Sequence, residues 1–206
     1  MRDASFRPPV ELRGRWVRLV PLQPEHAAPL ARALPPLEEI RYLGLRPGRT
    51  PAGMAEHIGE LLRRQADGTD LPFAIERASD GTVVGATRFL KIDRPNDAVE
   101  IGGSWLNRGA MRSPVNTEAK FLLLRHAFEA EHAVRVALQT DLRNERSQRA
   151  IARIGALREG IIRADRRTVD GYRRSSVVYS ILADEWPRVR RRLTEFLVRP
   201  WPAARA

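Results

Sequence analysis

The sequence predicts an α/β protein of the α+β type, with a mixed, largely antiparallel central sheet covered by helices on both faces. The first observation is periodicity, because runs that alternate apolar and polar residues are interspersed with runs of helical spacing. The second is the turn chemistry, which joins strand-like runs into hairpins while helices separate the hairpins. Helices interleaved with hairpins favour a mixed sheet with both faces covered.

The chain of 206 residues contains no repeat and no low-complexity linker, so we expect one domain over 1–206. Its core is expected at about 14–183, followed by a C-terminal helix and tail over 184–206. The absence of cysteine excludes disulfides, thiolate catalysis and Cys-based zinc sites. No signal peptide and no apolar run near the roughly 20 residues of a membrane span is recognisable. We therefore expect a soluble, cytoplasmic protein without membrane contact.

The first half of the chain predicts a strand over 15–22 and a short helical region from Pro24 to Leu34. A longer helix follows, with Thr50 as its N-cap and Pro51 at its first position, and it ends near Gly68. Three strand-like runs come next, at 71–78, 82–92 and 98–106. The Asp-Gly within "SDGT" predicts a hairpin between the first two of these runs.

The second half alternates more evenly. It predicts a helix from Asn116 to about Glu131, a strand over 134–141 and a helix over 144–154. Two strands follow, at 156–167 and 173–182, and the turn "DGY" at 170–172 joins them. Asp184 is expected to cap a final basic helix. That helix carries an apolar stripe, which either packs on the sheet or joins two subunits: Val189, Leu193, Phe196 and Leu197.

The net charge is +11, and only Lys91 and Lys120 of the 36 basic residues are lysines. Guanidinium groups match phosphate geometry with a forked pair of donors, so a phosphorylated cofactor and nucleic acid both fit such a surface. A general preference for arginine in the composition explains the positive charge equally well. Charge alone therefore does not choose a function.

The stretch "SPVNTEAKFLLLRHAFE" places Asn116 and Thr117 at the start of an amphipathic helix, with Arg112 just upstream. Asn is a preferred N-cap, and the free amides of a helix start also attract anions. The N-terminal end of this helix, its mouth, is therefore either a plain helix start or a binding site for phosphate.

In "AVEIGGSWL", strict alternation separates two faces, Val99, Ile101 and Trp105 against Glu100, Gly102 and Ser104. A lone carboxylate then lies beside a glycine gap through which a ligand could approach the strand. Glu100 is either a partnered structural residue or part of a site. The histidines have no metal-site spacing, and no metal is expected: His26, His57, His126 and His132. Serine-hydrolase and P-loop motifs are missing.

The block "DLRNERSQRAIARIGALREG", 141–160, resembles the acyl-CoA-binding half of the GNAT superfamily of N-acetyltransferases. The phrases "VNTEAKFLLLRHAFE" and "VVYSILADEWPRV" resemble its RimJ/RimL-like branch, which acetylates the N-termini of ribosomal proteins. The resemblance extends from about Gly14 to Leu197 and is most specific from Glu100 onward. It implies a GNAT fold whose strands at 98–106 and 134–141 splay apart around coenzyme A.

The resemblance also implies that the pyrophosphate of acetyl-CoA, the co-substrate, lies at the helix mouth near Asn116. Most members carry RxxGxG or QxxGxG there, whereas 111–116 contains no glycine and Pro114 has no N–H. Arg112 and the remaining amides are expected to bind the phosphates instead. The cofactor-binding residues implied are Trp105, Leu106, Arg112, Ser113, Val115, Asn116, Thr117, Asn144, Ser147 and Arg149.

The catalytic residues implied are Glu100 and Ser147. Glu100 would accept the proton of the amine, and Ser147 would protonate or hydrogen-bond the departing thiolate. Many members use a tyrosine for the thiolate, but that position is Ile151 here. The alternative is that no protein acid is required, because a thiol leaves tolerably well unaided.

The function expected is acyl-CoA-dependent N-acylation by direct attack of an amine in a ternary complex. The acceptor is a protein N-terminus, including that of a ribosomal protein, or a small amine, and the enzyme is expected to be a homodimer. The alternative is a non-catalytic acyl-CoA sensor or an RNA- or ribosome-binding protein. Nucleic acid is the less favoured partner, because the basic residues are spread along the chain.

Overall fold

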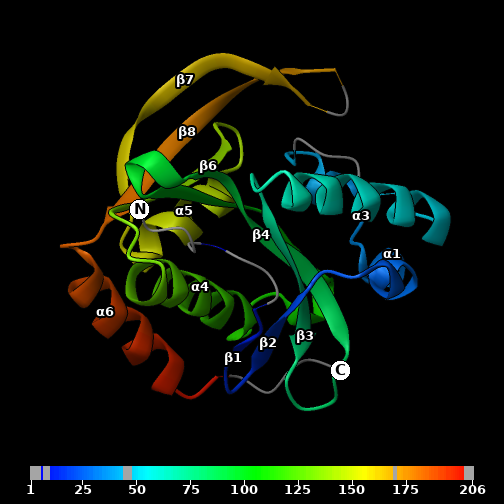
Figure 1. Ribbon diagram of the computed structural model, residues 1–206, viewed down its shortest axis with the longest axis horizontal. Helices are drawn as coiled ribbons and strands as arrows, with labels where there is room; N and C mark the ends of the chain where they lie inside the picture. The colour runs from blue at the N-terminus through cyan, green and yellow to red at the C-terminus, as the bar shows by residue number, and fades with distance from the viewer. Residues whose placement is uncertain (1–5, 7–9, 44–47, 169–170, 202–206) are drawn as a thin grey trace.

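One eight-stranded sheet runs through the protein, and the computed structural model describes residues 6, 10–43, 48–168 and 171–201 (Figure 1). The strand order is β1-β2-β3-β4-β5-β6-β8-β7. The pair β5–β6 is parallel, and the other neighbouring pairs are antiparallel. The strands are β1 Leu12–Arg13, β2 Val17–Pro21, β3 Leu71–Arg77, β4 Val83–Asp93, β5 Ala98–Leu106, β6 Arg135–Asp141, β7 Leu157–Arg167 and β8 Arg173–Leu182. The predicted mixed, largely antiparallel sheet is confirmed.

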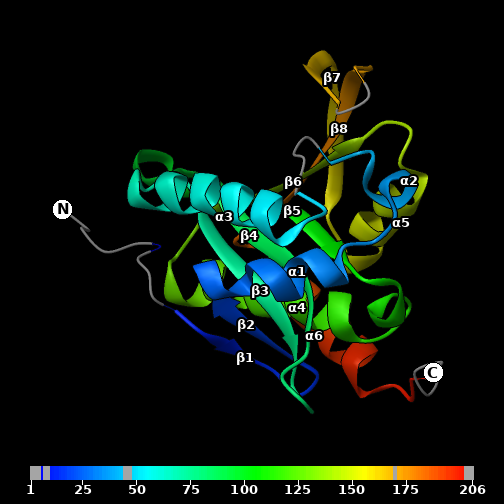
Figure 2. The same cartoon turned by 90° about the vertical axis from the view of Figure 1, so that its right-hand side faces the viewer.

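Helices cover both faces of this sheet, as predicted (Figures 1 and 2). Helices α1 and α3 pack together over one face, while α4, α5 and α6 cover the other. The helices are α1 Ala27–Ala33, α2 Leu37–Ile40, α3 Pro51–Ala66, α4 Val115–Arg125, α5 Glu145–Ile154 and α6 Trp186–Val198. A π-helical turn, His126–Ala130, extends α4 close to the predicted end.

Helix ends follow the local chemistry in some places and not in others. Thr50 accepts a hydrogen bond from the amide of Gly53 at 3.1 Å, as expected of the α3 N-cap. Asp184 is not the cap of α6, because the helix begins two residues later and Glu185 occupies the cap position. Strand β1 and helix α2 were not predicted, because two and four residues are too few to show a periodicity. The turn expected at 170–172 lies partly outside the described residues.

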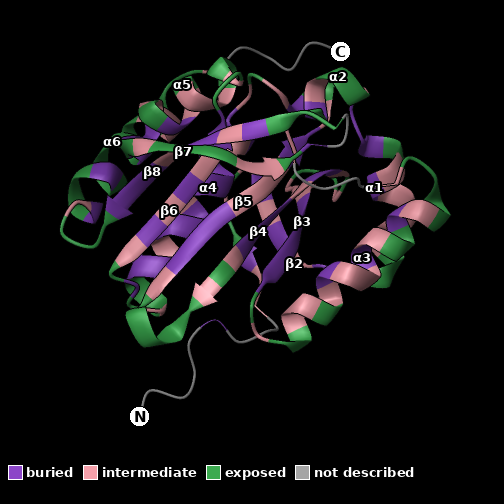
Figure 3. Cartoon of the chain, turned by 90° about the horizontal axis from the view of Figure 1, so that it is seen from above, coloured by how far each residue is buried: buried purple, intermediate pink, exposed green. Residues whose placement is uncertain are grey.

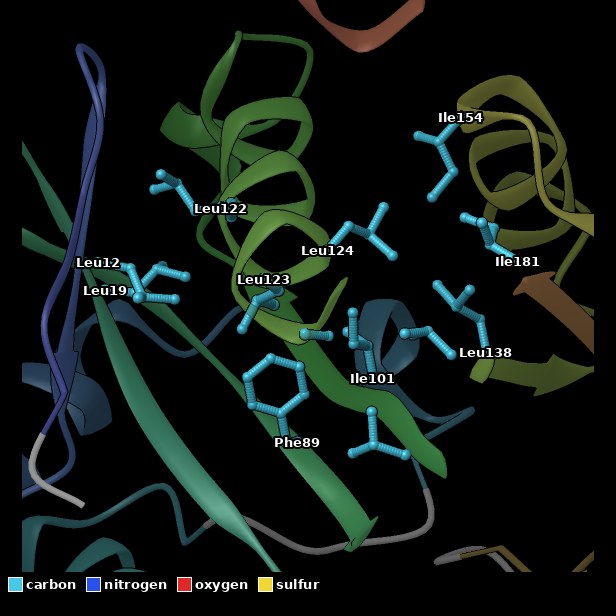
Figure 4. Packing of buried hydrophobic residues seen from close by; sticks show 14 of the residues in the cluster. Leu12, Leu19, Phe89, Ile101, Leu122, Leu123, Leu124, Leu138, Ile154 and Ile181 are labelled. Atoms are coloured by element: carbon cyan, nitrogen blue, oxygen red, sulfur yellow. The ribbon is translucent and has the colours of Figure 1, made fainter. Parts of the chain in front are cut away.

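Two hydrophobic cores hold the layers together. Figure 3 shows how buried and exposed residues are distributed over the helices and strands. In the larger core, leucines of α4 meet side chains from the central strands and α5, including Phe89, Ile101, Leu138 and Ile154 (Figure 4). The smaller core lies beneath α1 and α3. The α6 stripe enters the larger core, with Val189 and Leu193 fully buried. The stripe therefore packs on its own domain and lends no support to the homodimer, which stays a prediction.

A buried carboxylate fastens α4 to the start of β2. Glu118 accepts backbone hydrogen bonds from Arg15 at 2.9 Å, Trp16 at 2.6 Å and Val17 at 2.8 Å. A side chain at Gly14 would overlap this carboxylate, so glycine is needed for the close approach. Glu118 is therefore directed at β2 and satisfied by protein amides.

No helix in the described ranges combines the length and the apolar character that crossing a bilayer requires.

Replacing Glu118 tests this attachment. Glu118→Gln keeps the size of the side chain but turns one acceptor oxygen into a donor that faces backbone N–H groups. We expect the free energy of unfolding to fall by about 3 kcal/mol, the scale of one or two hydrogen bonds to a charged group. Urea unfolding with an unchanged m-value measures the loss, and the exposed control Glu56→Gln should leave the midpoint in place. A loss below about 0.5 kcal/mol would contradict the assignment.

Candidate active site

The sheet opens into a wedge between β5 and β6. The two strands pair from Ala98 to Ile101 on β5 and from Arg135 to Leu138 on β6. Both strands continue further, β5 to Leu106 and β6 to Asp141. The second half of β5 therefore has no sheet neighbour on its β6 side. This is the splayed arrangement that the sequence resemblance implied.

A bulge interrupts β5 inside the wedge. Ala86 of β4 pairs with Trp105 and Arg88 pairs with Gly102, so Gly103 and Ser104 together lie opposite a single residue of β4. Gly103 has a φ of 60°, a conformation that glycine adopts without strain.

The bulge overturns the strict alternation expected for this strand. Val99 and Ile101 face the larger core, as predicted, but Trp105 belongs to the smaller core on the opposite face. Ser104 also changes sides, because its hydroxyl meets Lys120 of α4 rather than the face of Glu100. One inserted residue moves each later side chain of the strand to the opposite face of the sheet. The Gly-Gly pair was the signal in the sequence that could have revealed this.

The predicted cofactor residues Trp105 and Leu106 have buried side chains, each 8% exposed, in the two cores. Their side chains are therefore occupied by packing. Only the backbone of this half of β5 is left to contact a molecule in the wedge.

Helix α4 begins one residue earlier than predicted. Val115 is the first helical residue and Pro114 holds the cap position, so the expectation that Asn116 is the N-cap is wrong. The Ser113 hydroxyl donates to the carbonyl of Ala110 at 2.6 Å and accepts from the amide of Val115 at 3.3 Å. This turn takes over the role of the cap.

Two amides at this mouth remain available. Within the described ranges, no backbone oxygen or side chain accepts a hydrogen bond from the N–H of Asn116 or Thr117. Free first-turn amides at the positive end of a helix dipole are the usual partners of a bound anion. The geometry therefore retains an anion site without the glycines of the common family motif.

Arginines surround the same mouth. Arg112 is exposed and adopts a left-handed φ of 58°, which is costly for a residue with a Cβ. Arg153 of α5 donates to the hydroxyl of Thr117 at 2.8 Å, and its burial lowers the pKa of its guanidinium. Arg146 approaches the sulfur of Met111 at 3.6 Å. Positive charge thus gathers where α4 begins, supplied by the preceding loop and by both ends of α5.

Asn144 caps α5 as predicted, since its side-chain oxygen accepts from the amide of Ser147 at 3.1 Å. The hydroxyl of Ser147 has no partner in the part of the chain that the structure describes. Arg149 is exposed and pairs with Glu145 at 3.0 Å, so it is directed along the helix surface. Ile151, at the usual tyrosine position, is 7% exposed and packs in the larger core.

Beside the start of α5 lies a pocket of about 310 Å³. It is lined by α2 and the segment after β6, with residues of both charge signs: Glu38, Glu39, Arg41, Tyr42, Arg143, Asn144, Glu145 and Arg146. The pocket thus lies beside Asn144 and the segment that follows β6.

Glu100 is 6% exposed and accepts a hydrogen bond from the ammonium of Lys91 at 2.7 Å. It shares the α3 side of the sheet with Gly102, where a side chain would come within 3.5 Å of the carboxylate. Arg88 and Asp70 form a buried ion pair at 3.2 Å on the same side. Burial raises the pKa of Asp70 and lowers that of Arg88.

Lys120 is the polar residue of this region that sequence reasoning missed. Its ammonium donates to the hydroxyl of Ser104 at 2.6 Å, and burial lowers its pKa to about 8. A charged residue within the apolar face of an amphipathic helix, in a chain with two lysines, was the signal that could have identified it.

Comparison with known proteins agrees with this architecture. A family profile described as an acetyltransferase (GNAT) domain matches residues 17–157. The chain is 35% identical over 107 residues to a Bacillus subtilis (strain 168) protein named "Putative ribosomal N-acetyltransferase YdaF". That match covers 52% of this chain and 57% of the relative, so it spans little more than half of the relative's length.

Solved structures match over greater lengths. One described as a "putative acetyltransferase" from T. thermophilus is 39% identical with a TM-score of 0.84, covering 93% of this chain and 99% of that one. A GCN5-related N-acetyltransferase from Brucella melitensis is 28% identical with a TM-score of 0.84, covering 96% and 91%. Because the family match extends over most of the chain and the fold agrees with it, the chain belongs to the GNAT acetyltransferase family.

Proposed function

We propose that this protein transfers an acetyl group from acetyl-CoA to a primary amine by direct attack in a ternary complex. The wedge between β5 and β6, with the free amides of α4 at its mouth, is the observation that carries the proposal. Phosphates of the donor would meet the amides of Asn116 and Thr117 and the side chain of Arg112. The residues present therefore fit the donor, although the glycines of the common motif are replaced.

The thioester would lie along the second half of β5. Trp105 and Leu106 would contribute backbone groups there, because their side chains are packed in the cores. Backbone N–H groups that face developing negative charge are efficient, since they are fixed before the reaction begins. Asn144 and Ser147, at the start of α5, would contact the pantetheine and the departing sulfur.

Glu100 is proposed to take the proton that an ammonium must lose before it can attack. Its carboxylate already holds an ammonium, that of Lys91 at 2.7 Å. An acceptor amine would replace Lys91 beside the same oxygen. The arrangement thus suits an acceptor that arrives as a cation.

The acceptor is proposed to reach the wedge through the pocket beside α2. Its mixed charges suit the N-terminus of a peptide as well as a small amine, and the name of the Bacillus relative favours a ribosomal protein. A ribosomal acceptor would make the cytoplasm the site of action. The net charge of +11 keeps a non-catalytic RNA- or ribosome-binding protein as the second candidate.

A direct assay separates these two candidates. We expect release of coenzyme A when the protein meets acetyl-CoA and a panel of N-terminal peptides and small amines, and thermal stabilisation by acetyl-CoA at micromolar concentration. Tight, steeply salt-dependent RNA binding with neither of these effects would establish the second candidate instead.

The anion site is tested by Arg112→Ala. We expect coenzyme A to bind more weakly by about 1.5 to 3 kcal/mol, the value of a charge-assisted hydrogen bond. Pantetheine, which lacks the pyrophosphate, should be affected little. Calorimetric titration measures both ligands, and Arg63→Ala, an exposed arginine of α3, controls for the general loss of positive charge. Equal losses for both ligands would remove Arg112 from the phosphate site.

The base is tested by Glu100→Gln, which preserves shape and removes proton acceptance. We expect kcat at neutral pH to fall by at least about tenfold, since general-base assistance is worth roughly 10²- to 10⁴-fold. The rate should recover partly at high pH, where free amine is abundant, while the affinity for acetyl-CoA stays nearly unchanged. A purely structural Glu100 predicts a lower Tm with a normal rate per folded molecule, so the pH–rate profile and Tm are measured on one preparation.

A further inference from the structure

The bulge of β5 lies between two buried cations, one on each face of the sheet. On the α4 side, the ammonium of Lys120 meets the hydroxyl of Ser104 at 2.6 Å. On the α3 side, the guanidinium of Arg88 lies over Gly103, where an added Cβ would be 3.3 Å from Nε and 3.5 Å from Cζ. Lys120 and Arg88 are 8% and 6% exposed, so water screens neither charge effectively.

The two cations differ in whether a nearby carboxylate neutralises their charge. Arg88 has a carboxylate partner, since Asp70 lies 3.2 Å away and is itself buried. Lys120 contacts a neutral hydroxyl, which also shares a hydrogen bond with Thr87 at 2.7 Å. Among the described residues, no carboxylate forms an ion pair with Lys120. The pair Arg88–Asp70 is neutral as a unit, so the uncompensated positive charge behind the bulge belongs to Lys120.

An uncompensated buried cation is costly for the folded state. Removing an ammonium from water without a counter-ion disfavours its charged form, which is why the pKa of Lys120 falls to about 8. Leucine or methionine would fill this position on the apolar face of α4 without that cost. A lysine at this position is therefore explained by a benefit to function, which arises when negative charge comes close to it.

We propose that Lys120 is a positioning residue of the acetyl-transfer reaction, which acts through Ser104 to fix the bulge and to hold positive charge behind it. The inference rests on the proposed function, in which the thioester lies along this half of β5. As the amine adds to the carbonyl, its oxygen gains negative charge; a cation fixed beforehand in a region of low dielectric stabilises that charge. The nitrogen–carbon bond forms, the carbon–sulfur bond breaks, the amine proton passes to Glu100 and the electron pair leaves with sulfur.

The test uses Lys120→Met, which fills a similar volume without charge, and Arg63→Met, at an exposed position of α3, as the control for the loss of one positive charge. We expect Lys120→Met to lower kcat at least tenfold at pH 7, with the Kd of coenzyme A changed less than twofold. Its Tm should exceed that of the wild type near pH 7. The difference should shrink between pH 8 and 10.5, because the wild type alone regains stability as its folded state releases the proton earlier than the unfolded chain.

Lysine-selective isotope labelling gives a readout that does not depend on turnover. The chain has two lysines, so two side-chain NMR signals are expected, and Lys91→Arg assigns them. The Lys120 signal should titrate near pH 8, and its pKa should rise when a ketone analogue of acetyl-CoA binds. Wild-type kcat should decline as Lys120 loses its proton. In Lys120→Arg, a folded variant should keep its activity through that range, because guanidinium stays protonated.

The outcomes separate the two proposals. If the wild type neither binds nor uses acetyl-CoA, the proposed function fails and this inference fails with it. If the wild type transfers acetyl groups and folded Lys120→Met does so at an unchanged kcat, the function stands and the role of Lys120 is refuted. A Lys120 signal that titrates near pH 10.5, or does not respond to the ketone analogue, also refutes it.

Discussion

The parallel contact between β5 and β6 is the constraint on which the rest of the architecture depends. It joins two antiparallel sections of the sheet, yet it extends over four residue pairs only. If it were longer, the wedge would close. If it were lost, the strands on either side would no longer share a sheet. The larger core crosses this junction, with Ile101 and Leu138 packing from its two strands, and their burial keeps a short pairing intact.

Three of the buried charged side chains are accommodated in different ways. Glu118 is satisfied by backbone amides and fastens α4 to the start of β2. Arg88 is neutralised by Asp70. Lys120 donates to the hydroxyl of Ser104 and forms no ion pair with a carboxylate in the described part of the chain. The arrangement of Glu118 stabilises the fold, and the pair of Arg88 with Asp70 is nearly neutral in its effect on stability. The arrangement of Lys120 lowers stability and is therefore the one that points to function.

The element order was readable from the sequence because hydrophobic periodicity and turn chemistry are local signals. Thr50 and Asn144 were identified correctly as N-caps, since each precedes an uninterrupted helical run. Asn116 was not, because a Ser-Pro turn starts α4 one residue earlier. The facing of Trp105 was also wrong, since alternation holds only until a bulge inserts a residue. Partners distant in sequence, such as Glu118 and the amides of β2, leave no local pattern.

The scarcity of lysine has a consequence for the chemistry that the protein can perform on itself. An enzyme that concentrates an activated thioester at its surface exposes its own amines to acylation. Guanidinium stays protonated at physiological pH and is a poor nucleophile, so an arginine-rich surface attracts an anionic donor without being modified by it. Of the two lysines, Lys120 is buried, and Lys91, whose side chain is 55% exposed, pairs with Glu100. Arginine thus supplies positive charge while leaving few side-chain amines open to acylation.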